Sequence, residues 1–217
     1  MRGAAHANEG ALPIPASSVR PIFILADDLT GAADAAHYFR SERCRVRVTF
    51  DGAAPWAPSL GAGTVQVHDS ETRAVPASAA RDRIIGAVAA LLNRPGPAPR
   101  VFKKVDSTLR GPLGVELEAT LRTLRWPLAL LAPALPVHRR TVRGGRVAVD
   151  GVPVTATVFA RDPRAPVRSD RIAEVLRETT ALPTHEIDLA TVRAGPARLC
   201  EVLRGIPPDP GIAVVDA

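Results

Sequence analysis

The stretch "FILADDLTGAAD", residues 23–34, decides the fold that the rest of the sequence predicts. Phe23 to Ala26 are apolar without alternation, which is typical of a strand buried on both faces of a parallel sheet. Two adjacent aspartates and then Thr-Gly follow at once, and "GAADAAHYF" has the spacing of a helix. Such a strand-to-helix turn at the carboxyl end of a strand is where open α/β sheets bind their ligands.

Composition bounds the class of protein. The chain has 217 residues, of which 46% are hydrophobic, enough for a full core. No apolar run approaches the roughly 20 residues of a membrane span. Residues 1–20 are rich in Ala, Pro and Ser without periodicity and lack the apolar core of a signal peptide, so we expect a flexible leader and a cytoplasmic protein.

Transition-metal and nucleic-acid sites are not expected. The two cysteines, Cys44 and Cys200, lie far apart, and the five histidines form no ligand pattern, so we predict free thiols and no transition-metal site. The net charge is +6, but the arginines are spread along the whole chain and aromatic residues make up 4%, which disfavours nucleic acid as a partner.

Strand and helix patterns alternate along the chain. This alternation predicts an α/β fold with a mainly parallel sheet, right-handed crossovers and helices on both faces. The segment "RTVRGGRVAVDGVPVTAT" differs, because short alternating runs are separated by Gly-Gly and Asp-Gly. We therefore expect a small β-hairpin insertion around residues 141–158.

The first candidate site is the turn after the first strand. Asp27 and Asp28 suit a general base toward a hydroxyl group, and Thr30 and Gly31 begin the helix beyond them. Ligation of magnesium suits the same pair of carboxylates. A plainer interpretation is that one aspartate caps the helix while the other is solvated.

The second candidate site is the loop from Lys103 to Gly111. It collects Lys103, Lys104, Asp106, Ser107 and Arg110 immediately before Gly111 and a predicted helix. Such a loop can hold a carboxylate or phosphate. Alternation sends the two lysines, which are the only ones in the sequence, to opposite faces of the strand, and either could contact the ligand. The plainer interpretation is a surface turn with a local Lys-Asp pair.

Several common nucleotide and phosphatase motifs are absent. The P-loop pattern does not occur, and "GAGTVQ" lacks the third glycine of the dinucleotide motif. A haloacid-dehalogenase phosphatase would have its aspartates two residues apart, whereas Asp27 and Asp28 are adjacent.

Three long motifs, in order, resemble the N-terminal domain of the four-carbon acid sugar kinase family. They are "ILADDLTGAADAA", "KKVDSTLRGPLGVELEA" and "PALPVHRRTVRGGRVAVDGVPVTATVFARDPRAPVRSD". The resemblance implies that residues 21–217 bind a sugar acid such as threonate, erythronate or oxo-tetronate. It also implies phosphorylation from ATP with Mg²⁺, held mainly by a C-terminal nucleotide-binding domain that we expect to be absent from this chain.

Residue roles follow from the same resemblance. Asp27 and Asp28 would face substrate hydroxyls, and Lys104, Asp106, Ser107 and Arg110 would surround the acid and the transferred phosphate. Arg140, Arg161 and Asp162 match further motif positions. The sequence departs from the family at Val137 to Arg139, where polar residues and a glycine are usual, so the preferred acid stays open.

Two functional hypotheses follow. In the first, the chain is the substrate-binding half of a kinase, inactive until a C-terminal domain is supplied in trans. In the second, it is a stand-alone sugar-acid-binding or regulatory module. An exposed edge at the final strand, "GIAVVDA", favours self-association, so a homodimer is also expected.

Overall fold

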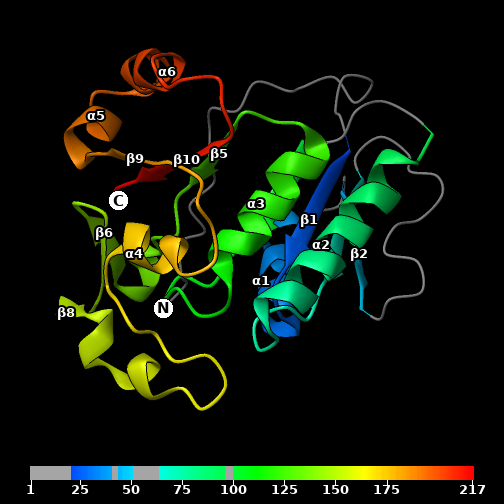
Figure 1. The fold of residues 1–217 in the computed structure, drawn as a ribbon, viewed down its shortest axis with the longest axis horizontal. Coiled ribbons are helices and arrows are strands. Elements are labelled where there is room, and N and C mark those ends of the chain that lie inside the picture. Colours follow the sequence, from blue (N-terminus) through cyan, green and yellow to red (C-terminus); the bar gives the residue numbers. More distant parts are fainter. Residues whose placement is uncertain (1–20, 41–43, 51–63, 96–99) are drawn as a thin grey trace, which may run out of the picture.

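The computed structural model describes residues 21–40, 44–50, 64–95 and 100–217, which form two parallel sheets, a small antiparallel sheet and the helices that cover them (Figure 1). The leader expected at residues 1–20 lies outside the described residues. The α/β class, the parallel strands, the helices on both faces and the hairpin insertion are all confirmed.

The first sheet contains the strand that opens the predicted fold. Its four strands are parallel and run in the order β2-β3-β1-β4. Their bounds are β1 Ile22–Ala26, β2 Arg45–Thr49, β3 Thr64–Asp69 and β4 Arg100–Lys104. Because β1 is central, Phe23 to Ala26 have no exposed surface. This burial explains why the strand shows no alternation of polar residues.

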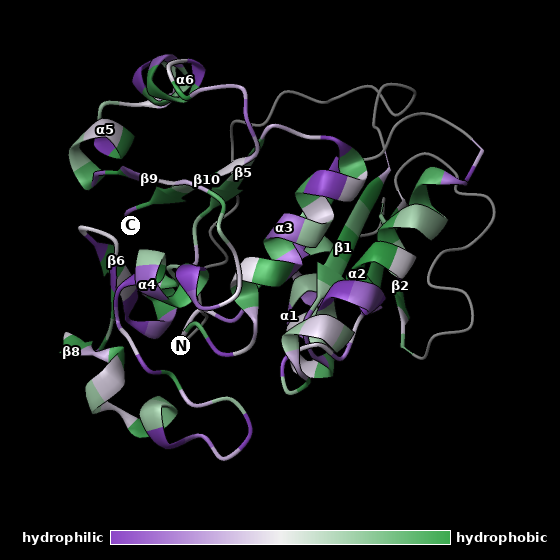
Figure 2. Cartoon of the chain, in the orientation of Figure 1, coloured by the Kyte–Doolittle hydropathy of each residue, from purple (hydrophilic) through white to green (hydrophobic). Residues whose placement is uncertain are grey.

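Helices cover both faces of this sheet. They are α1 Leu29–Phe39 on one face, and α2 Ala77–Leu92 and α3 Leu113–Leu124 on the other. Ile24 and Ala26 pack toward α1, whereas Phe23 and Leu25 pack against α2 and α3. In Figure 2 the hydrophobic colour of β1 lies between helices whose outer surfaces carry hydrophilic residues.

The remaining parallel strands form a second sheet, a division that the sequence did not predict. Its strands are β5 Leu128–Leu131, β9 Thr184–Ile187 and β10 Gly211–Val215, in the order β5-β10-β9. Helix α3 packs between the two sheets, since Leu117 and Leu121 share a core with Leu131 and Ile212. The other helices of this sheet are α4 Ile172–Arg177, α5 Leu189–Arg193 and α6 Pro196–Arg204.

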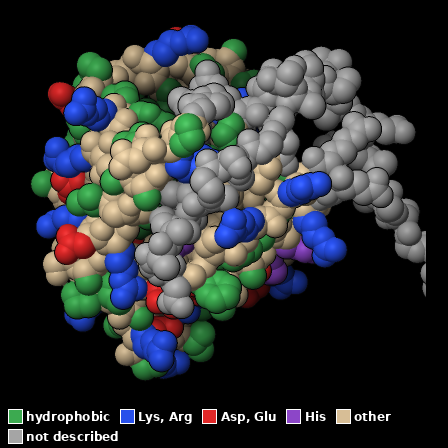
Figure 3. All heavy atoms as spheres, turned by 90° about the vertical axis from the view of Figure 1, so that its right-hand side faces the viewer, with side chains coloured by type: hydrophobic (Ala, Val, Ile, Leu, Met, Phe, Trp, Pro, Cys, Tyr) green, Lys and Arg blue, Asp and Glu red, His purple; other side chains and the backbone are tan. Residues whose placement is uncertain are grey.

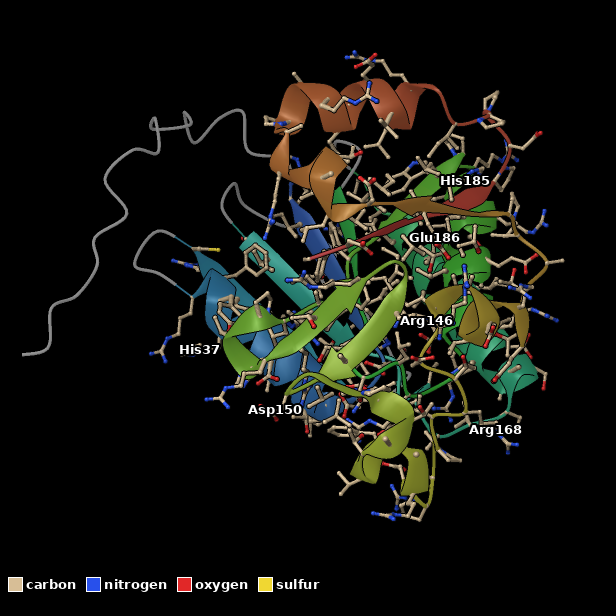
Figure 4. The ribbon with its side chains drawn as sticks, turned by 90° about the vertical axis from the view of Figure 1, so that its left-hand side faces the viewer. His37, Arg146, Asp150, Arg168, His185 and Glu186 are labelled. Atoms are coloured by element: carbon tan, nitrogen blue, oxygen red, sulfur yellow. The ribbon has the colours of Figure 1, made fainter. Side chains whose placement is uncertain are left out.

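The hairpin insertion forms the third sheet and is fastened to the second. Its strands are β6 Arg140–Arg143, β7 Arg146–Val149 and β8 Val152–Pro153, and short 3-10 turns flank them at η2 Pro136–His138, η3 Val154–Ala156 and η4 Val158–Arg161. At the end of β10, the Asp216 carboxylate accepts backbone N–H bonds from Gly144 (2.7 Å) and Gly145 (3.1 Å). Figure 4 views this side, where Glu186 of β9 lies beside the turn that precedes Arg146.

Two further observations concern surfaces and membranes. On the face that Figure 3 shows, lysine and arginine side chains are spread among other residues and form no continuous patch. Among the residues that the structure describes, no helix has the length and apolar character needed to cross a bilayer.

Candidate functional site

Three neighbouring strands of the first sheet end at one edge and bring polar residues together there. Asp27 follows β1, Asp69 ends β3, and Asp106 lies just beyond β4. The loop after β3 wraps around the end of β1, because the backbone N–H groups of Thr72 and Arg73 both donate to the Asp27 carbonyl, at 2.9 and 3.0 Å. This wrapping places the Arg73 side chain next to the acidic pair.

Arg73 pairs with both predicted aspartates. Its Nε and Nη2 donate to the two oxygens of Asp27, at 2.8 and 3.1 Å, and its Nη1 donates to Asp28. Asp28 also caps α1 by accepting the Gly31 N–H at 2.7 Å. The helix-cap part of the plainer interpretation is therefore correct, but Asp27 is buried, 3% exposed, and ion-paired rather than solvated.

Asp69 is a third carboxylate near this pair, and the sequence reasoning missed both it and Arg73. It is 4% exposed, and burial raises its pKa, with further contributions from the charges of Glu71, Asp28 and Asp27. A buried carboxylate with a raised pKa in a cluster of charges is typical of functional sites. The sequence did contain a signal for Asp69: in "VHDS" an aspartate stands at the end of a predicted strand, as the aspartates in "LADD" do.

The two lysines are separated as alternation predicts. Lys103 points to the side of α3 and forms an ion pair with Glu116 at 3.0 Å, with 5% and 3% of the two side chains exposed. Lys104 points to the side of α1. A Cβ atom placed on Gly31 would lie 2.9 Å from Asp28 Oδ1 and 3.5 Å from Lys104 Cγ, so Lys104 lies beside the acidic pair.

Asp106 and Arg110 form a second carboxylate–guanidinium fork. Arg110 Nε and Nη2 donate to the Asp106 oxygens at 2.8 and 3.1 Å, and Nη1 donates to Asp162 at 3.1 Å. Burial alone would raise the pKa of Asp106, but hydrogen bonds from Arg110 and Thr108, with the nearby charges, outweigh burial and lower the pKa to about 2. Arg73 contributes to this lowering, so the two forks are electrostatic neighbours.

The hairpin brings Arg140 to the same edge. Arg140 Nη1 donates to Ser107 Oγ at 2.5 Å, which joins β6 to the loop after β4. Within the described ranges, neither Arg140 nor Lys104 pairs with a carboxylate. These two cations therefore differ from Arg73 and Arg110, whose forks are already occupied.

The structure gathers most of the predicted residues and leaves a few outside. Those brought together are Asp27, Asp28, Gly31, Lys104, Asp106, Ser107, Arg110, Arg140 and Asp162. Gly111 has a positive φ of 93°, and a Cβ atom placed on it would lie 3.2 Å from the Arg73 backbone, so this turn requires glycine. Lys103 lies in its own ion pair, and Thr30 and Arg161 are exposed.

Comparison with known proteins shows the family to which this chain belongs. A model of the sugar-binding N-terminal domain matches residues 22–217. A D-threonate kinase from Salmonella typhimurium is 37% identical over 90% of this chain and 45% of its own length. A D-erythronate kinase from Heliobacterium modesticaldum is 34% identical, with the same two coverages of 90% and 45%.

A solved structure is also similar to this chain. A domain of unknown function from Bordetella bronchiseptica, with bound citrate and as a domain-swapped dimer, superimposes with a TM-score of 0.74 at 30% identity. The match covers 92% of this chain and 49% of that one. The chain spans about half the length of the curated relatives it matches. The resemblance to four-carbon acid sugar kinases is thereby confirmed, and the chain belongs to the sugar-binding N-terminal domain family.

Proposed function

We propose that this chain is the sugar-acid-binding half of an ATP-dependent kinase for four-carbon sugar acids of the threonate, erythronate or oxo-tetronate type. One observation carries the proposal: Lys104 and Arg140 lie without carboxylate partners, among the described residues, at the same sheet edge as Asp27 and Asp28. Cations that are not paired with a carboxylate of the protein suit the acid group of such a substrate, and carboxylates suit its hydroxyl groups. The names of the related kinases support the same class.

The geometry favours a division of roles between the two aspartates. Both oxygens of Asp27 accept from Arg73, and the side chain is 3% exposed. The two oxygens of Asp28 also accept hydrogen bonds, from the Gly31 N–H and from Arg73 Nη1, but its side chain is 27% exposed and can be reached by a ligand. We therefore assign Asp28 to the reacting hydroxyl, as general base or orienting acceptor, and Asp27 to the orientation of Arg73 and Asp28.

We propose that ATP and Mg²⁺ are bound mainly by a C-terminal domain outside this chain. Phosphoryl transfer requires positioning and charge stabilisation from both sides of the transferred group. In the part of the chain that the structure describes, no three His, Cys, Asp or Glu residues are arranged to hold a metal ion. When bound, the nucleotide would supply the phosphoryl group and Mg²⁺ would neutralise its charge, while this chain binds and orients the acceptor.

The proposal also includes the location of the protein, its partner domain and its self-association. The kinase half would be cytoplasmic and would work with a C-terminal domain, in the same polypeptide or in trans. The domain-swapped dimer of the Bordetella relative favours a homodimer here too. The alternative, a stand-alone binding or regulatory module, shares the same acid site and differs only in having no catalytic partner.

Calorimetric titration with D-threonate, D-erythronate and 3-oxo-tetronate tests the proposal. We expect one of these acids to bind, and Arg140→Ala to weaken binding about 10- to 100-fold, the size of a lost charged hydrogen bond. Arg139→Ala removes the same charge from an 81% exposed side chain and should have little effect. Absence of binding to all three acids, or equal losses in both variants, would contradict the assignment.

A complementation assay separates the kinase half from the module. The chain is mixed with the C-terminal half of a related D-threonate kinase, ATP and Mg²⁺, and phosphorylation of the acid is followed. Turnover that depends on both halves supports the kinase. Acid binding without turnover favours the binding module.

A further inference from the structure

We infer that Phe159 is a positioning residue that holds the Arg140 guanidinium at the ligand edge. The inference rests on the proposed function, because it assigns the orientation of the cation that would receive the substrate's carboxylate. Phe159 lies in the short turn η4 after the hairpin, far in sequence from the loops that carry the acidic residues.

The Phe159 ring contacts two of the site's arginines. The Cζ atom of Arg110 lies over the ring at 5.2 Å from its centroid, and that of Arg140 lies over it at 5.4 Å. Both distances are within the ≈ 6 Å over which an aromatic face attracts a guanidinium group. One ring therefore lies against the loop after β4 and against the hairpin.

The two arginines depend on this ring to different extents. Arg110 is fixed independently, because its Nε, Nη1 and Nη2 donate to Asp106 and Asp162. Arg140 donates to Ser107 alone, in the described part of the chain, and pairs with no carboxylate there. Loss of the ring should thus free Arg140 while Arg110 stays in place.

The ring itself is held by its backbone and by the core. The Phe159 N–H donates to Thr157 Oγ1 at 3.3 Å, and its carbonyl accepts the Val167 N–H at 3.1 Å. The side chain packs against the core that α3 shares with the second sheet. A rigid aromatic face on a fixed turn can order a long arginine side chain before a ligand arrives, which reduces the entropic cost of binding.

The inference requires the aromatic face, and not merely apolar bulk. Phe159→Leu keeps most of the volume and removes the ring, and Phe159→Met is a second non-aromatic variant. Phe159→Tyr restores a ring. Val158→Ala alters the neighbouring side chain, which is 67% exposed, and serves as the matched control.

The first measurement needs no ligand. In ¹H–¹⁵N spectra of arginine side chains, the Nε–H signals of Arg140 and Arg110 are identified by their loss in Arg140→Ala and Arg110→Lys. In Phe159→Leu or Phe159→Met we expect the Arg140 signal to lose its ring-current shift and to show greater mobility, while Arg110 stays ordered. The Tyr variant should restore the Arg140 signal. An Arg140 signal that is equally ordered in both non-aromatic variants would overturn the inference.

The second measurement links the position of Arg140 to binding. Titration with whichever of D-threonate, D-erythronate and 3-oxo-tetronate the unmodified chain binds should show about tenfold weaker binding in Phe159→Leu, recovery in Phe159→Tyr and no change in Val158→Ala. If the unmodified chain binds no acid, the proposed function fails, and the spectra still decide the role of Phe159. If the acid binds and Phe159→Leu binds it equally well, the positioning role is wrong and the proposed function stands.

Discussion

Replacing Lys103 with methionine should destabilise the fold without removing the proposed sugar-acid site. Lys103 and Glu116 form an ion pair at 3.0 Å with 5% and 3% of their side chains exposed. Removing the cation leaves the Glu116 carboxylate buried without its counter-charge. Breaking a buried ion pair in this way costs about 3–5 kcal/mol of the free energy of unfolding.

The structure indicates why this cost falls near the middle of that range. Glu116 Oε1 has no hydrogen-bond partner among the described residues, so Lys103 provides much of the carboxylate's compensation. Glu116 also lies in the first turn of α3, where the helix dipole stabilises a negative charge by about 0.3–1 kcal/mol. We therefore expect a loss of about 4 kcal/mol. The double variant Lys103→Met with Glu116→Leu should recover most of it, because no charge is left buried.

Urea denaturation measures these differences, and Lys104→Met is the matched control. Lys104 donates to the Val105 carbonyl and forms no ion pair in the described ranges, so its replacement should cost less than about 1 kcal/mol. It should instead weaken binding of the sugar acid. The reasoning is refuted if Lys103→Met costs less than 1 kcal/mol, or if its main effect is loss of ligand binding.

Three further changes test other features. The pKa of Asp106 is lowered from 3.8 to about 2, so its ionised form contributes stability above pH 4 that is lost as the pH falls through 2. In urea titrations from pH 5 downward, the difference in the free energy of unfolding between the unmodified chain and Asp106→Asn should shrink by about 2 kcal/mol. A Cβ atom on Gly114 would lie 2.4 Å from the Leu176 carbonyl, so Gly114→Ala should cost about 1–3 kcal/mol in thermal denaturation, whereas Gly86→Ala, with open space, should be neutral or stabilising. Burial raises the pKa of Asp69, so Asp69→Asn should unfold at an equal or higher urea concentration at pH 7, and any gain should fade as the pH falls below that raised pKa.

The local patterns of the fold were predictable, and the pairing of its strands was not. The apolar run at Phe23 to Ala26 identifies a central strand, and the Gly-Gly turn identifies the hairpin. The division into two parallel sheets depends on which strands share hydrogen bonds, and α3 packs against both sheets. The residues of β4 and β5 do not themselves indicate which of the two sheets each strand joins.

The candidate site shows the same division between local and distant information. Asp27, Asp28 and Asp106 follow strands, so the sequence predicted that they share one edge of the sheet. Arg73 stands four residues beyond the end of β3, in a loop without a motif, and its pairing with Asp27 links residues 46 positions apart. Charge pairing over such distances requires the fold to be known.

Because of these pairings, not every basic residue at the site is available to bind a ligand. Arg73 and Arg110 each neutralise a buried aspartate, so neither has a free fork for a ligand's carboxylate. The two cations of the candidate site that have no carboxylate partner among the described residues come from different parts of the fold. Lys104 belongs to the first sheet, and Arg140 belongs to the hairpin that Asp216 fastens to the second. A sugar acid held by both would bridge the first sheet and the hairpin, so its affinity would depend on how firmly the hairpin is held in place. Substitutions at the Asp216 attachment should therefore alter acid binding, although that carboxylate lies at the opposite end of β6 from Arg140.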